Sequence, residues 1–119
     1  MQVGDKATAT RVFTADMVAD FLDLAAASGP VDAVPEPLIG GLFSYLLGVD
    51  LPGFGTNYLK QEMEFLRPAP LGVTLTATVE ITRLRPEKHL CDLATTCTDA
   101  AGTVYCRGRA LVLVADVGR

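Results

Sequence analysis

Two carboxylates stand just before the most apolar stretch of the chain. Asp32 and Glu36 precede residues 38–48, which include no charged side chain. A partly buried carboxylate can act as a general acid or base near neutral pH. A carboxylate at the start of a helix can also serve only to stabilise the positive end of the helix dipole. Both roles fit these positions, and Glu36 is the better catalytic candidate, with Asp32 as the second.

The backbone amides that follow form a second candidate group for binding. If residues 38–48 are helical, the first N–H groups lack partners and can stabilise an oxygen that gains negative charge. The candidates are Leu38, Ile39, Gly40 and Gly41. Each glycine costs about 1 kcal/mol relative to Ala inside a helix. We therefore expect a strand, a partner subunit or a ligand to approach the backbone at this pair, although helix–sheet packing alone would explain it equally well.

The cysteines do not suggest a metal site. Cys91, Cys97 and Cys106 are six and nine residues apart, which matches no zinc signature, and an odd number cannot pair completely within one chain. His89, the only histidine, supplies no matching motif. We expect buried thiols that pack as small apolar groups, and no metal or other cofactor.

The elements that must position these residues form an α+β pattern. A short strand at 8–13 precedes a helix that Thr14 caps and that Ser-Gly-Pro at 28–30 ends. The second helix contains residues 38–48, which are apolar on nearly all sides and must be covered by other structure. Prolines are tolerated only near a helix start, so its N-terminus is expected around Pro35 to Leu38. Four strands with two-residue periodicity follow, at 58–65, 73–82, 89–98 and 103–115. The sequence therefore predicts an antiparallel sheet with one apolar face, covered by the 38–48 helix.

Composition limits the possible classes of partner. The chain has 119 residues, half of them apolar and a fifth charged, with a net charge of −4, and we expect one domain spanning residues 1–119. The negative charge and the lack of a basic run argue against a nucleic-acid partner. The longest uncharged apolar stretch is too short to cross a membrane, and the first residues contain no apolar signal region. We expect a cytoplasmic protein with no membrane partner.

Several segments, in this order and spacing, resemble the MaoC-like hydratase/dehydratase family, which includes (R)-specific enoyl-CoA hydratases. They are Val3-Gly4-Asp5, Phe13-Thr14, Leu51-Pro52-Gly53-Phe54-Gly55-Thr56, Tyr58-Leu59-Lys60-Gln61, Phe65-Leu66-Arg67-Pro68, Thr78-Val79-Glu80-Ile81-Thr82 and Thr96-Cys97-Thr98. The resemblance covers most of the chain. It implies a hot-dog fold, in which an antiparallel sheet wraps a long central helix, and a thioester of CoA or of an acyl carrier as ligand.

The chain departs from the family in the segment that contains the catalytic residues of the family hydratases. Family hydratases have an Asp-x-Asn-Pro-x-His segment after the first helix and a His-Gly-Met start to the central helix, and that Asp and His activate the water. Here the corresponding segment, residues 26–37, is shorter and contains no Asn-Pro-x-His. Pro35-Glu36-Pro37 falls where His-Gly-Met lies in the family. We therefore expect an acyl-thioester-binding protein from which the hydratase dyad has been lost.

Two alternatives remain open from the sequence. Some hot-dog thioesterases use one acidic residue beside the central helix, so this chain could be an acyl-CoA thioesterase that uses Glu36. It could also be a non-catalytic subunit that partners an active hydratase. A small sheet leaves a long edge strand unpaired, and hot-dog proteins join such edges across a two-fold axis, so we expect a homodimer or a dimer of dimers.

Overall fold

The computed structural model describes residues 1–24 and 32–117. Its strands form one antiparallel five-stranded sheet in the order β1-β3-β4-β5-β2, which confirms the expected sheet. The strands are β1 (Lys6–Val12), β2 (Asn57–Phe65), β3 (Thr74–Arg85), β4 (Leu90–Asp99) and β5 (Val104–Leu113). Strands β1 and β2 form the two edges, so β2 meets the rest of the sheet only through β5.

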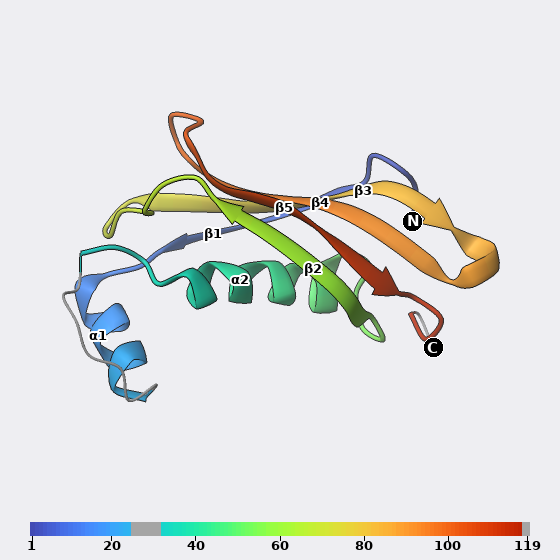
Figure 1. The fold of residues 1–119 in the computed structure, drawn as a ribbon, viewed down its shortest axis with the longest axis horizontal. Helices are drawn as coiled ribbons and strands as arrows, with labels where there is room; N and C mark the ends of the chain where they lie inside the picture. Colours follow the sequence, from blue (N-terminus) through green and yellow to red (C-terminus); the bar gives the residue numbers. More distant parts are fainter. Residues whose placement is uncertain (25–31, 118–119) are drawn as a thin grey trace.

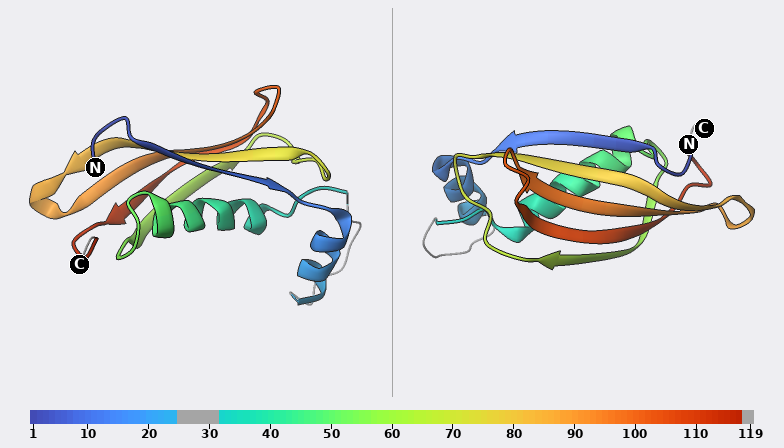
Figure 2. Two further views of the ribbon diagram at one scale, coloured as in Figure 1. Left: turned by 180° about the vertical axis from the view of Figure 1, so that it is seen from behind. Right: turned by 90° about the horizontal axis from the view of Figure 1, so that it is seen from above.

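Helix α2 (Glu36–Tyr45) lies against one face of this sheet and crosses it diagonally (Figures 1 and 2). A turn of π-helix, η1 (Leu46–Asp50), extends it. The buried residues of β3 and β4 that alternate toward this helix are Leu75, Ala77, Val79, Ile81, Cys91, Leu93, Thr95 and Cys97. Ile39, Phe43 and Leu46 of the helical segment are at most 1% exposed. The helix therefore covers the apolar face of the sheet, which confirms the α+β hot-dog architecture.

Helix α1 (Ala15–Leu24) lies at one end of the molecule (Figure 1). Thr14 caps it as expected, because the Met17 N–H donates to Thr14 Oγ1 at 3.2 Å. Val18 is its one fully buried side chain. The helix stop expected at residues 28–30 lies outside the described residues. No helix among residues 1–24 and 32–117 is long and apolar enough to cross a membrane.

The glycine pair of α2 is less crowded than the sequence led us to expect. A Cβ at Gly40 would meet the Met63 side chain at an ordinary 3.4 Å. A Cβ at Gly41 would have no atom within 4 Å, and Gly41 is exposed. Within the described protomer the sheet therefore does not approach the backbone of Gly41, because this residue faces away from the sheet that α2 covers.

We expect the Gly41→Ala substitution to raise the melting temperature. Ala is favoured over Gly by about 1 kcal/mol inside a helix, and the new methyl group meets free space in the protomer. For a chain of this size the gain corresponds to a few degrees. Thermal unfolding followed by circular dichroism measures it. A lower midpoint would contradict the prediction and would indicate that another subunit packs against Gly41.

Candidate functional site

A pocket of about 540 Å³ opens beside the start of α2. One wall is formed by residues 32–36 and Ile39, and the other by residues 65–69, at the end of β2 and just beyond it. The Val34 N–H donates to the Ala69 carbonyl at 2.9 Å and so joins the two walls. Val34 and Ala69 are both buried, which anchors this junction to the core. We call this pocket the α2 pocket.

Both predicted carboxylates lie at the α2 pocket. Asp32 belongs to the segment before the helix and Glu36 is the first residue of α2. Both side chains are exposed, so the partial burial that would favour acid–base chemistry is not found in the isolated protomer. Arg67 supplies the one cationic side chain of the pocket lining. The pocket therefore combines two carboxylates and one guanidinium with apolar walls.

Helix α2 begins within the range expected from its prolines, but Gly40 and Gly41 lie beyond its first turn. The helix begins at Glu36, two residues before the apolar run, with Pro37 in its first turn. Pro37 has no N–H, and the Leu38 N–H donates to the Pro35 carbonyl at 3.0 Å. Gly40 and Gly41 lie in the second turn, where N–H groups bond to carbonyls of the preceding turn. Of Leu38, Ile39, Gly40 and Gly41, Ile39 alone lines the α2 pocket.

Residues 65–69 were not predicted as part of the site, although they form its second wall. Phe65, Leu66 and Pro68 served only as markers of the family resemblance, and Arg67 was considered besides only as one of several arginines that could meet a CoA phosphate. The position of residues 65–69 follows from the place of β2 in the sheet. β2 is the edge strand beside β5, and its last residue lies near the start of α2 (Figure 1). Two-residue periodicity identifies a strand but not its neighbours. The Phe-Leu-Arg-Pro motif was the one sequence signal that could have identified this wall.

The cysteines are buried thiols, as expected from the sequence. Burial raises the pKa of Cys91, Cys97 and Cys106 to about 11. The neighbouring Cys97 and then Glu36 also raise the pKa of Cys106, each less than burial does. All three thiols are therefore protonated at neutral pH and do not supply a nucleophile to the pocket.

We expect the native thiols to resist alkylation. Iodoacetamide reacts with the thiolate, and a pKa of about 11 leaves well under 1% of each thiol ionised at pH 8. The native protein should show no labelling over a period in which the urea-unfolded chain is fully labelled. Intact-mass spectrometry at pH 8 counts the labelled thiols. Labelling of the native and unfolded protein at equal rates would contradict this prediction.

His89 lies away from the α2 pocket. It follows the short 3₁₀ turn η2 (Pro86–Lys88) between β3 and β4 and has a positive φ of 56°. Its carbonyl accepts a hydrogen bond from the Val114 N–H at 2.8 Å. His89 lines a different pocket, together with Met1 and Leu84. The structure therefore brings no histidine to the carboxylates of this protomer.

Comparisons with known proteins identify relatives of this arrangement. No protein-family model matches the sequence. An (R)-specific enoyl-CoA hydratase from Aeromonas caviae is 35% identical over an alignment that covers 94% of each chain. The solved structure of the (R)-hydratase from A. caviae involved in PHA biosynthesis has a TM-score of 0.88 with this chain, at 34% identity, covering 94% of this chain and 96% of that one.

A second relative matches over a shorter region. An (R)-specific enoyl-CoA hydratase from Rhodospirillum rubrum is 46% identical over 77 residues, which are 65% of this chain and 53% of that protein. This match therefore spans about half of the R. rubrum protein. The A. caviae alignment has 126 positions, more than the 119 residues of this chain. The A. caviae enzyme therefore has residues within the aligned region that have no counterpart here.

Proposed function

Because this chain belongs to the MaoC-like family of (R)-specific enoyl-CoA hydratases, we propose that it binds acyl thioesters in the α2 pocket and has lost the usual hydratase dyad. The observation that carries the proposal is the pocket itself. It places apolar side chains such as Ile39 and Phe65 beside a few polar groups at the start of the central helix. Small-molecule sites in proteins combine apolar walls and a few polar groups in this way.

The loss of the dyad rests on the composition of this pocket. Hydration requires a water that is held by a base and a group that delivers a proton to the α-carbon. The family resemblance assigns these tasks to an Asp and a His on one loop. The only histidine of this chain is His89, at the turn between β3 and β4. Asp32 lies at the pocket but lacks the Asn-Pro-x-His sequence that follows the family aspartate.

Thioester hydrolysis is the second candidate activity, and the position of Glu36 favours it. The carboxylate of Glu36 would take a proton from water, and the resulting hydroxide would add to the thioester carbonyl. Collapse of the tetrahedral intermediate breaks the C–S bond, and the departing thiolate takes up a proton. Arg67, at the same pocket, is a candidate partner for the developing negative charge. Neither hydration nor this hydrolysis requires a metal or another cofactor.

We also propose a homodimer, or a dimer of dimers, formed through edge strand β2. This nine-residue strand is unpaired along one side, and Leu59 on it is 54% exposed. Tyr45 and Val49, from α2 and η1, add exposed apolar surface. A long edge with exposed apolar side chains is normally covered by another chain. The third possibility, a non-catalytic subunit beside an active hydratase, would use the same edge.

The cellular setting follows from this ligand. An acyl thioester of CoA or of an acyl carrier places the protein in fatty-acid metabolism. We propose that it acts in the cytoplasm, as its composition led us to expect. We also propose that residues 1–119 form one domain, with a single thioester site in each protomer.

One set of assays separates these functions. Purified protein is given crotonyl-CoA and a series of saturated acyl-CoAs, while hydration, CoA release and binding are measured in parallel. We expect measurable binding with little hydration. CoA release that Glu36→Gln abolishes would establish the thioesterase, whereas binding without turnover would establish the non-catalytic role. The matched control is Glu64→Gln, an exposed carboxylate on β2 outside the α2 pocket. The absence of both binding and turnover would overturn the proposal.

A further inference from the structure

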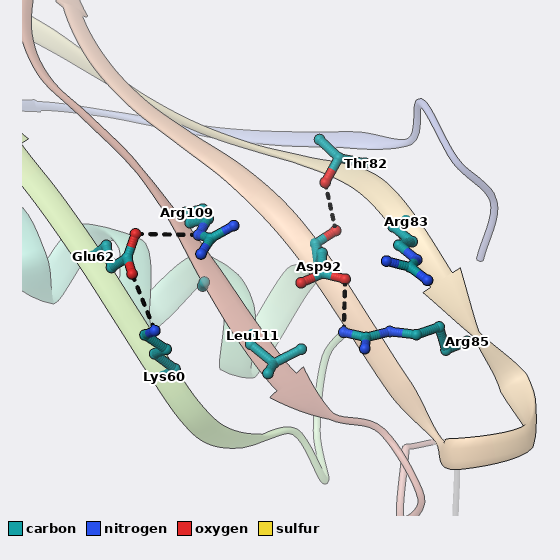
Figure 3. A pocket seen from close by; sticks show the side chains of 9 residues that line it. Lys60, Glu62, Thr82, Arg83, Arg85, Asp92, Arg109 and Leu111 are labelled. Carbon is teal, nitrogen blue, oxygen red and sulfur yellow. Dashed lines mark hydrogen bonds and ion pairs between the residues drawn. The ribbon is translucent and has the colours of Figure 1, made fainter.

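A second pocket, of about 420 Å³, lies on the face of the sheet that points away from α2 (Figure 3). Strands β2, β3, β4 and β5 all contribute to it. Its charged side chains are Lys60, Glu62, Arg83, Arg85, Asp92 and Arg109. Four cations against two carboxylates leave an excess of two positive charges, although the whole chain carries a net charge of −4. This contrast in charge favours an anionic ligand at this point of the surface.

Two β-bulges place cations in this outer pocket. In β3 the register shifts between Ile81 and Arg83, so that Arg83 stands opposite Asp92. Ile81 is buried on the face of the sheet that α2 covers. In a regular strand Arg83 would point to the same face, because side chains two residues apart lie on one side of the sheet. In β2 the register with β5 shifts between Tyr58 and Lys60. Lys60 is a second cation of the outer pocket that stands at such a bulge. Bulges of this kind re-aim side chains and occur beside functional sites.

The ion pairs of the pocket do not neutralise all of its cations. Glu62 is shared, since Lys60 Nζ and Arg109 Nε each lie 3.2 Å from one of its carboxylate oxygens. These two cations hold the pKa of Glu62 below its usual value and keep it ionised. Arg83 forms no ion pair with any residue in 1–24 or 32–117, and Figure 3 shows its guanidinium beside the paired groups. Among the described residues, one cation of the pocket is thus unpaired, and two others share one carboxylate.

Arg85 is held in place but retains donor capacity. Its Nη2 donates to Asp92 Oδ2 at 3.0 Å. Its Nε is buried and has no hydrogen-bond partner within the described part of the chain. A buried donor without a partner is costly, so the hydrogen-bonding capacity of this guanidinium is not used up by the described residues.

We propose that this outer pocket binds the phosphate group of a small ligand. A phosphate dianion carries the two negative charges that match the excess of the pocket, whereas a carboxylate carries one. The planar guanidinium groups of Arg83 and Arg85 suit the paired hydrogen bonds that phosphate oxygens accept. The site lies on the face of the sheet opposite the α2 pocket and is independent of the thioester chemistry. The phosphate belongs either to free inorganic phosphate or to a nucleotide.

Nuclear magnetic resonance of the full-length ¹⁵N-labelled protein tests this site. Sodium phosphate and adenosine 5′-monophosphate, each with one phosphate dianion, are titrated separately at low ionic strength. We expect saturable shifts of the backbone amides of residues 82–85 and Asp92 with at least one probe. Tighter binding of adenosine 5′-monophosphate identifies a nucleotide as the source, and equal or tighter binding of inorganic phosphate identifies free phosphate.

The matched variants are Arg83→Gln and Arg107→Gln. Both remove one positive charge from the outer face of the sheet, but Arg107 pairs with Glu64 and lies outside the outer pocket. We expect Arg83→Gln to weaken phosphate binding about tenfold and Arg107→Gln to change it less than twofold. Equal losses of phosphate affinity in both variants would show that binding depends only on the overall positive charge of this face, and would overturn the proposal. So would the absence of saturable shifts with both probes in the unmodified protein.

Discussion

Crotonyl-CoA hydration by this protein should be about 10²–10⁴-fold slower than by an intact family enzyme. Loss of one positioned acid–base group removes a rate factor of that size. The α2 pocket contains Asp32 and Glu36 but no histidine, and both carboxylates are exposed. Two carboxylates could in principle share one proton, but exposure to water weakens the coupling that this requires. The rate is measured from the loss of enoyl-thioester absorbance, with the A. caviae hydratase assayed in parallel.

The variant Glu36→Gln supplies the control for this prediction. Any residual hydration should change little, because the missing histidine limits the rate. A turnover equal to that of the A. caviae enzyme, abolished by Glu36→Gln, would show instead that Glu36 is a replacement catalyst. Glu64→Gln, on the outer face of the sheet, should leave the rate unchanged in either case.

The substitution Gly108→Ala should clearly destabilise the protein, because Gly108, the one glycine within the described strands, leaves no room for a side chain. A Cβ at Gly108 would overlap the carbonyl oxygen of Glu62 and crowd the Cα of Met63. The backbone of β2 runs antiparallel beside β5 here, with Met63 opposite Gly108, so relief requires a shift of β2 relative to β5. Overpacking of this kind costs about 1–3 kcal/mol or more. The melting temperature should fall by roughly 5–10 °C.

The matched comparison is Gly41→Ala, which adds the same methyl group at an open position. The two variants should move the melting temperature in opposite directions. If the melting temperature of Gly108→Ala lies within a degree of that of the unmodified protein, the prediction is contradicted, and the backbone of β2 does not lie this close to Gly108.

The fold could be predicted because its signals are local. Alternation of Leu75, Ala77, Val79 and Ile81 with threonines identified a strand with one apolar face, and this face is the one that α2 covers. Thr14 identified a helix start through its capping hydroxyl. Bulges are harder to predict, because the extra residue in β3 becomes visible only when β4 is placed beside it. The pattern gave no indication that Arg83 would leave the face of Ile81.

Of the two walls of the α2 pocket, only the wall that contains Asp32 and Glu36 could be predicted from the sequence. Asp32 and Glu36 were identified by their position before the apolar helix, and both lie at the α2 pocket. The wall at residues 65–69 comes from a strand that is distant in the sequence, and the sheet order alone brings it there. The prolines predicted a helix start between Pro35 and Leu38, and α2 begins at Glu36. The amides of Gly40 and Gly41, which were offered as donors, lie inside the helix beyond its first turn.

Binding of an acyl thioester in the α2 pocket is the central claim, and calorimetry tests it most directly. The probe is the butyl thioether of CoA, which can be neither hydrated nor hydrolysed. Phe65→Trp enlarges a half-buried ring in the pocket wall, whereas Phe54→Trp makes the same exchange at a site that is 79% exposed and outside the pocket. We expect saturable binding by the unmodified protein and by Phe54→Trp, and at least tenfold weaker binding by Phe65→Trp. Equal affinities for all three proteins, or no binding by the unmodified protein, would contradict the account.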